Sequence, residues 1–257
     1  MDRTVYTYGK DKRTEYSAAY LKRRLGDGGA VHILPIPTTK DGVEVYGGDI
    51  TLDEISASAK EGEAYITYGV PERFAENIRC RGARIYDAKY DEEYQEEGAY
   101  LTALGTVVKI LGNGNKSPRQ LKIGIIGYGR IGRNLLEMLY FLGAELLVVT
   151  GRRSILESLS SLGVSAMERE TLSSMRNTGE NPFLNMDILI NTAPAHTICS
   201  EDKENLKGVE IIELASGDNI PHDIPYTRFG SVPAEMFAQS AGISYAAHAI
   251  KAFGNSI

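Results

Sequence analysis

Short apolar runs rich in Val, Ile and Tyr alternate along the chain with segments in which apolar residues recur every three or four positions. Such runs predict strands, and the recurring positions predict amphipathic helices. In the first hundred residues the pattern predicts strands at 5–8, 31–36, 64–67 and 83–86, with helices near 16–25 and 71–81. Strands that alternate with helices are typical of parallel sheets joined by crossover helices. We therefore expect a small α/β domain here.

A long amphipathic helix is predicted next, because apolar residues recur at helical steps from Tyr94 to Leu111. It ends in Gly112-Asn113-Gly114-Asn115, and Pro118 follows closely. Since Gly and Asn accept left-handed backbone conformations and Pro cannot continue a helix, this stretch marks a domain boundary. We expect residues 1–115 to form a substrate-side α/β domain with its linker helix.

The second half repeats the alternation, with strands predicted at 122–126, 145–150, 165–167, 187–191 and 209–214 and a last helix at 237–253. The expected fold class is α/β, with a doubly wound parallel sheet of the Rossmann type beside the smaller N-terminal domain. We expect residues 116–257 to form this dinucleotide-binding domain. The last helix is expected either to stay with it or to pack back toward the first domain.

A glycine-rich turn carries the clearest chemical signal. The strand at 122–126 runs into Gly127-Tyr128-Gly129-Arg130-Ile131-Gly132, and a helix pattern follows at once. Gly127 suits a tight turn, Gly129 lets the backbone approach a pyrophosphate, and Gly132 lets the helix pack closely on the strand. The helix N-terminus supplies free N–H groups for the phosphates. We predict a dinucleotide site; the alternative is a glycine-rich turn that binds nothing.

The end of the second strand of this domain favours NADP(H), although NAD(H) stays possible. A site that prefers NAD usually has a carboxylate here for the ribose 2′-hydroxyl. This chain instead reads Thr150-Gly151-Arg152-Arg153-Ser154. Guanidinium groups suit a 2′-phosphate because Arg offers a planar charged fork. The alternative is an ordinary solvated helix start.

Other candidates follow from the expected topology. Asn191-Thr192-Ala193-Pro194 and Ser216 follow two later strands, where a cofactor or substrate would lie. In a cleft between the domains, the loops after the first two strands would present Asp11, Arg13, Thr38 and Thr39 to a carboxylate substrate. His196 and His222 are weak catalytic candidates, while His32 and His248 fall in element patterns and are expected to be structural.

Composition excludes several classes of function. A net charge of -6 with interleaved signs gives no broad basic face for nucleic acid. Only Cys80 and Cys199 occur, at no metal or redox spacing, so we expect free thiols, no metal centre and a cytoplasmic protein. No apolar stretch of about 18 residues predicts a membrane span, and no signal-peptide core follows the start.

The whole chain resembles the dipicolinate synthase family, in particular the larger of its two kinds of subunit. The resemblance rests on Gly9 to Arg13, Leu34-Pro35 with Thr38-Thr39, Glu76-Asn77-Ile78, Gly105-Thr106, Gly151-Arg152-Arg153-Ser154, Ile190-Asn191-Thr192 with Pro194, Leu214-Ala215-Ser216, and Pro233 with Ala241-Gly242. It implies a bacterial, sporulation-linked NADP-dependent dehydrogenase, related in architecture to D-2-hydroxyacid dehydrogenases. It also implies oxidation of a cyclic dicarboxylate of the lysine pathway to dipicolinate, usually with a flavoprotein-like partner subunit. We also expect a homo-oligomer.

The chain departs from that family where substrate chemistry is concerned. Gly217-Asp218-Asn219-Ile220 stands where the family typically has Arg-Pro-Gly-Gly, Gln239 lies near an expected lysine, and Leu104 replaces a glutamate. Fold and cofactor therefore carry over more directly than the substrate. Two alternatives stay open. One is a D-2-hydroxyacid dehydrogenase-like enzyme, although the strand ending at Ser216 lacks the Arg that it would need. The other is a non-catalytic pyridine-nucleotide sensor or assembly subunit.

Overall fold

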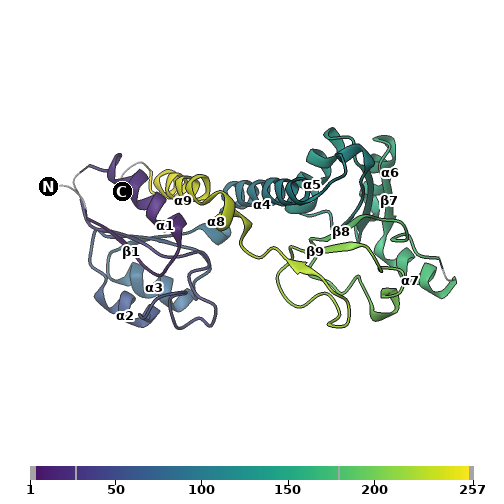
Figure 1. Ribbon diagram of the computed structural model, residues 1–257. Helices are drawn as coiled ribbons and strands as arrows, with labels where there is room; N and C mark the ends of the chain where they lie inside the picture. The colour runs from purple at the N-terminus through teal and green to yellow at the C-terminus, as the bar shows by residue number, and fades with distance from the viewer. Residues whose placement is uncertain (1–3, 27, 179, 255–257) are drawn as a thin grey trace. The chain divides into compact units, whose positions relative to one another are not determined.

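The computed structural model describes residues 4–26, 28–178 and 180–254. Its strands form two parallel sheets flanked by helices, which confirms the expected α/β class (Figure 1). The chain divides into two compact units: Met1–Gly98 with Pro233–Ile257, and Ala99–Val232. No helix among the described residues is long and apolar enough to cross a lipid bilayer.

The first unit contains a four-stranded sheet in the order β1-β2-β3-β4. Its elements are β1 (Val5–Thr7), α1 (Lys12–Lys22), β2 (Val31–Ile33), α2 (Leu52–Ser58), β3 (Ala64–Thr67), α3 (Glu72–Cys80) and β4 (Arg84–Asp87). Side chains of β2 and β3 share one buried core with those of α1 and another with those of α2 and α3. The strand pattern predicted this sheet, but α2 was missed. Its signal was a capping box in which Thr51 and Glu54 bond to each other's backbone N–H.

The long helix α4 (Glu92–Asn113) starts and ends where its apolar spacing predicted. Tyr94 near its start is buried in a core of the first unit, whereas Ala103, Val107 and Ile110 are buried in a core of the second. The first unit therefore ends within α4 at Gly98, and not at residue 115 as the glycine-rich turn suggested.

The last two helices, α8 (Val232–Met236) and α9 (Ala238–Ala252), also change the expected division. Helix α9 lies beside α1 (Figure 1), and a Cβ at Gly242 would be 2.3 Å from the carbonyl oxygen of Arg13. The buried Ser17 hydroxyl donates a 2.7 Å hydrogen bond to the carbonyl oxygen of Gly242. Residues 233–257 thus belong to the first unit and not to the dinucleotide-binding domain, because α9 completes a core on α1.

The second unit contains a six-stranded parallel sheet in the order β10-β9-β8-β5-β6-β7. Its elements are β5 (Lys122–Ile126), α5 (Arg130–Phe141), β6 (Glu145–Thr150), α6 (Leu156–Ser161), β7 (Ser165–Glu168), α7 (Arg169–Thr178), β8 (Ile188–Asn191), β9 (Glu210–Glu213) and β10 (Thr227–Arg228). The chain winds outward from β5 through β6 to β7, then returns to the other side of β5 with β8. In doubly wound sheets, ligands bind outside the carboxyl ends of the strands at this reversal.

Candidate dinucleotide-binding site

The three glycines of the turn after β5 have different surroundings. Gly127 adopts a φ of +100°, which favours glycine, and a Cβ there would lie 2.6 Å from Thr192 Oγ1. A Cβ at Gly132 would lie 2.2 Å from the carbonyl oxygen of Gly127, so α5 can approach the turn only without a side chain. Gly129 caps α5 and has no atom within 4 Å of its Cβ position. The turn is therefore tightly packed on its inner side and open at Gly129.

A pocket of about 340 Å³ lies at the carboxyl ends of β5, β6 and β8. Predicted cofactor residues that line it are Gly127, Tyr128, Gly129, Thr150, Gly151, Arg152, Thr192, Ala193 and Pro194. The remaining lining residues are Ile126, Val149, Arg169 and Thr197. None of these described residues carries a carboxylate, so the electrostatic surroundings suit an anion.

The other predicted cofactor residues lie around the pocket without lining it. Arg130 and Ile131 are in the first turn of α5, and Gly132 is buried beneath the glycine turn. Arg153 and Ser154 are exposed in a short 3-10 turn after β6, and Ser216 is exposed after β9. The Thr150 hydroxyl accepts a hydrogen bond from the Arg152 backbone N–H at 3.1 Å, which fixes the chain where it leaves β6.

Asn191 is buried and supports the pocket from behind. Its Oδ1 accepts from the Ala193 N–H at 3.2 Å, and its Nδ2 donates to the Ala193 carbonyl and to both carboxyl oxygens of Glu213, each at 3.1 Å. Glu213 is fully buried at the end of β9. Burial raises the pKa of Glu213, against the hydrogen bonds that Asn191 and the Ala215 N–H donate to it. These contacts tie the turn that follows β8 to the end of β9.

Arg169 and Thr197 line the pocket although the sequence reasoning did not select them. Arg169 directly follows β7, so the rule that placed Arg152 at the end of β6 would also have found Arg169. Thr197 is three residues beyond the predicted Pro194, and its buried hydroxyl has no hydrogen-bond partner within the described part of the chain. No strand-end pattern marks Thr197, because it reaches the pocket through the path of a loop.

The loop after β9, where the chain departs from the family it resembles, is held by Arg228 of β10. Arg228 donates from Nη1 to the carbonyl oxygen of Ala215 at 3.2 Å and from Nη2 to that of Gly217 at 2.8 Å. Gly217 has a φ of +91°, which few other residues adopt. This departure thus forms an ordered turn with its own cation.

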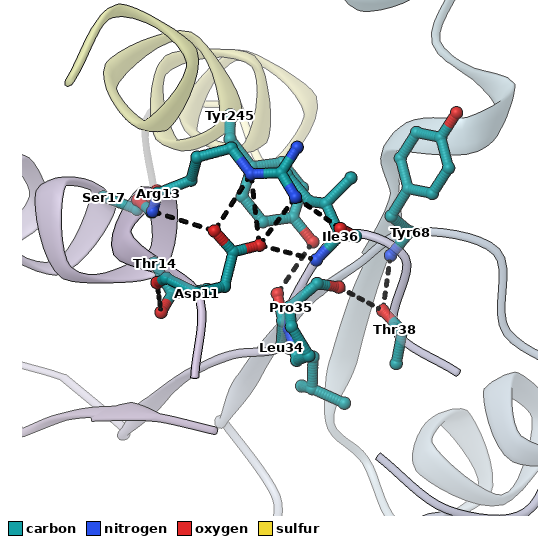
Figure 2. Close-up of polar contacts among 10 residues, drawn as sticks. All are labelled: Asp11, Arg13, Thr14, Ser17, Leu34, Pro35, Ile36, Thr38, Tyr68 and Tyr245. Carbon is teal, nitrogen blue, oxygen red and sulfur yellow. Dashed lines mark hydrogen bonds and ion pairs between the residues drawn. The ribbon is translucent and has the colours of Figure 1, made fainter. Parts of the chain in front are cut away.

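In the first unit, Asp11 and Arg13 bind each other (Figure 2). The Arg13 guanidinium donates from Nε and Nη2 to the Asp11 carboxylate, with Nη2 to Oδ2 at 2.8 Å, and also bonds the carbonyl oxygen of Ile36. Burial alone would raise the pKa of Asp11, but bonds from Arg13 and from the Ile36 N–H outweigh it, so this pKa is lowered. The side chains are only 8% and 11% exposed. Arg13 is thus already charge-compensated, and only Nη1 takes part in none of these contacts.

Thr38 and Thr39 are engaged locally. The buried Thr38 hydroxyl donates to the carbonyl oxygen of Pro35 at 3.1 Å and accepts from the Tyr68 N–H at 2.8 Å (Figure 2). The Thr39 hydroxyl donates to Asp41 Oδ1 at 3.0 Å and accepts from the Gly42 N–H. Both threonines shape the loop after β2, and Thr38 fastens it to the end of β3.

None of the four histidines lines the nucleotide pocket. His196 is exposed, and His222 is 87% exposed, with Nε2 3.2 Å from Asp218 Oδ2. His32 is buried against the ring of Tyr65 and accepts or donates at Tyr8 Oη, while His248 faces Asp91 and Glu97. Among the described residues, no three His, Cys, Asp or Glu side chains lie together as metal ligands would, and both cysteines are free.

A parallel sheet wound on both sides, with a glycine turn and a pocket at its reversal point, defines the second unit as a Rossmann-type domain of the NAD(P)-binding oxidoreductase fold. Solved structures of dipicolinate synthase, each of its A-type polypeptide, share the fold of the whole chain. The one from Bacillus halodurans has a TM-score of 0.74 at 15% identity, covering 98% of both chains. The one from Bacillus subtilis has a TM-score of 0.72 at 16% identity, covering 100% of this chain and 97% of that chain.

A D-lactate dehydrogenase from Treponema pallidum is also similar, with a TM-score of 0.51 at 13% identity over 95% of this chain and 94% of that chain. No family model matches this sequence, and no curated protein sequence matches it. At these identities the likeness establishes the fold. It confirms the expected architecture, including the expected relation to D-2-hydroxyacid dehydrogenases.

Proposed function

We propose that this chain is a cytoplasmic NADP(H)-dependent oxidoreductase that oxidises a small cyclic dicarboxylate. The pocket at the reversal point of the second sheet carries the proposal, because it joins a glycine turn to a guanidinium and has no carboxylate among its described lining residues. A dinucleotide with an extra phosphate brings more negative charge than NAD(H), and such a lining favours it.

The residues of the pocket divide the cofactor's parts between them. Gly129 and the N-terminus of α5 would bind the pyrophosphate, since the backbone there is open and offers unpaired N–H groups. Arg152 would bind the 2′-phosphate, with Arg153 and Ser154 close by in sequence. Thr192, Ala193 and Pro194 would line the nicotinamide ribose, held by Asn191. When bound, the oxidised nicotinamide accepts a hydride from a substrate carbon, so the chain's own task is orientation.

The substrate part of the proposal rests on the resemblance and on the loops that carry Asp11, Arg13, Thr38 and Thr39. The name of dipicolinate synthase, whose fold this chain shares, indicates a pyridine dicarboxylate as product. In this chain a substrate carboxylate would have Arg13 Nη1 available, or would displace Asp11 from the guanidinium. A homo-oligomeric assembly and a flavoprotein-like partner subunit complete the proposal.

A second candidate is a non-catalytic nucleotide-binding subunit. The pocket favours it in one respect, because its described lining residues include no carboxylate, imidazole, thiol or amine to move a proton. Turnover separates the two candidates. The purified chain should reduce NADP⁺ with a cyclic dicarboxylate, alone or with a flavoprotein-like subunit, if it is an enzyme of this type. Reduction with D-lactate instead would identify the 2-hydroxyacid dehydrogenase alternative.

Cofactor preference is the direct test of the proposed site. NADPH should bind more tightly than NADH in a fluorescence titration. Replacing both Arg152 and Arg153 by Ala should cost at least about 2 kcal/mol for NADPH and leave NADH nearly unchanged, because charged hydrogen bonds to a phosphate are lost. Equal affinities in the wild-type protein would contradict the preference for NADP(H).

A further inference from the structure

Arg169 reaches the nucleotide pocket from a strand that the glycine-turn motif does not involve. Strand β7 pairs with β6 in parallel, and Glu168 lies opposite Thr150 in the register. Both strands therefore end at the same level of the sheet. Arg152 leaves this edge two residues after Thr150, and Arg169 leaves it one residue after Glu168. Both arginines line the same pocket.

The order of the strands sets which part of a bound dinucleotide lies near Arg169. The pyrophosphate belongs at the glycine turn after β5, and the adenosine ribose belongs at the end of β6. Strand β7 lies beyond β6, on the side away from β5. Neighbouring strands are about 4.8 Å apart, so an arginine side chain from the end of β7 spans the distance to a group over the end of β6. The group there is the ribose 2′ position.

The charges of Arg169 and Arg152 are open to such a ligand. Arg169 Nη2 lies 3.5 Å from Glu170 Oε1, and these side chains are 47% and 66% exposed. An exposed pair of this kind is weak because water screens it, so a phosphate that accepts several charged hydrogen bonds replaces it readily. Arg152 forms no ion pair with another side chain in the described ranges 4–26, 28–178 and 180–254.

Resting on the proposed function, we propose that Arg169 is the second cation of the 2′-phosphate site and a determinant of selectivity for NADP(H). Arg152 and Arg169 then hold the phosphate from two adjacent strands. An approach from two sides places donors on different oxygens of the phosphate. A ribose 2′-hydroxyl, which carries no charge, gains little from the same two groups.

The test compares Arg169→Gln with the matched control Glu170→Gln, which removes the ion-pair partner and keeps the arginine. Calorimetry would measure binding of NADPH, NADH, 2′,5′-ADP and 5′-AMP to the full chain. Arg169→Gln should weaken NADPH and 2′,5′-ADP by about tenfold or more, as expected for loss of a charged hydrogen bond, and leave NADH and 5′-AMP within about twofold. Glu170→Gln should leave all four affinities within about twofold, and thermal unfolding should show both variants folded.

Three outcomes would overturn the inference. If Arg169→Gln weakens NADH as much as NADPH, Arg169 contacts the pyrophosphate and not the 2′-phosphate. If Arg169→Gln keeps the wild-type preference for NADPH, Arg169 is only a surface partner of Glu170, and the proposed cofactor still stands. If the wild-type protein binds none of the four nucleotides, the proposed function fails first and the inference fails with it.

Discussion

At the scale of single residues, the glycine turn separates the requirements of folding from those of binding. A side chain at Gly132 would meet backbone atoms of Gly127, which cannot move without disturbing the turn. A side chain at Gly129 would meet nothing in the protein, and the φ of -85° at Gly129 is open to other residues. Gly129 is therefore free to change as far as the fold is concerned, and Gly132 is not.

We predict opposite effects for two substitutions in this turn. Gly129→Val should leave a folded protein that binds neither NADPH nor NADH, because the isopropyl group takes the place of the pyrophosphate. Gly132→Ala should lower the free energy of unfolding by about 1 to 3 kcal/mol through overpacking. Nucleotide titration and urea denaturation measure the two effects.

Gly230 provides the control, since its Cβ position is also open and it does not line the pocket. Gly230→Val should keep the wild-type affinity for both nucleotides. Unchanged nucleotide affinity in Gly129→Val would mean that the glycine turn is not the site.

At the scale of elements, the packing of α9 on α1 depends on a close approach at Gly242. Helix propensity alone predicts that Ala at any exposed glycine inside a helix stabilises the protein by about 0.5 to 1 kcal/mol. At Gly242 the new Cβ would lie 2.3 Å from the carbonyl oxygen of Arg13 and 2.9 Å from Tyr16 Cβ, so the helices would have to separate. Packing should therefore outweigh propensity at this position.

Gly98 in α4 is the matched comparison, because its Cβ position has no atom within 4 Å. We expect Gly242→Ala to destabilise the protein by about 1 to 3 kcal/mol and Gly98→Ala to stabilise it slightly. Thermal unfolding followed by circular dichroism would show the two shifts in opposite directions. A higher melting temperature for Gly242→Ala would show that the contact between α1 and α9 is looser than the structure has it.

At the scale of the whole molecule, the two candidate sites belong to different compact units. The nucleotide pocket is made from residues between Ile126 and Thr197, within the second unit, whereas Asp11 and Arg13 belong to the first. Changes at the carboxylate candidates should therefore leave the nucleotide affinity nearly unaltered.

This separation leads to a prediction for the substrate. With NADP⁺ present, Arg13→Ala should weaken dipicolinate binding about tenfold or more and leave NADPH binding within about twofold. Asp11→Asn is the informative partner variant, since it removes the competing carboxylate and keeps the guanidinium. It should bind dipicolinate at least as tightly as the wild-type protein.

Calorimetry of the three proteins measures these affinities, and thermal unfolding checks that the first unit stays folded in each. If the wild-type protein binds no dicarboxylate, the substrate assignment fails. Equal dipicolinate affinity in Arg13→Ala would leave Arg13 with the structural task of bonding Asp11 and Ile36.

The sequence by itself determined the features that depend on neighbouring residues. Alternating apolar runs predicted both parallel sheets, and the spacing of Gly127, Gly129 and Gly132 predicted a turn between a strand and a helix. These signals are local, since a strand, a glycine turn and an amphipathic helix each report their own period and backbone needs within a few residues. The strand-end rule then brought Arg152 and Thr192 to the pocket for the same reason.

The tertiary structure decided what depends on partners far apart in the chain. Ser17 and Gly242 are bonded across 225 positions, and no local pattern assigns α9 to the first unit. The pairing of Arg13 with Asp11 turned a candidate ligand into an internal ion pair, because charge compensation depends on side-chain direction. Arg169 joined the pocket through the register of β7 on β6. Periodicity predicts that a strand exists, but only pairing across the sheet determines which side chains meet at its edge.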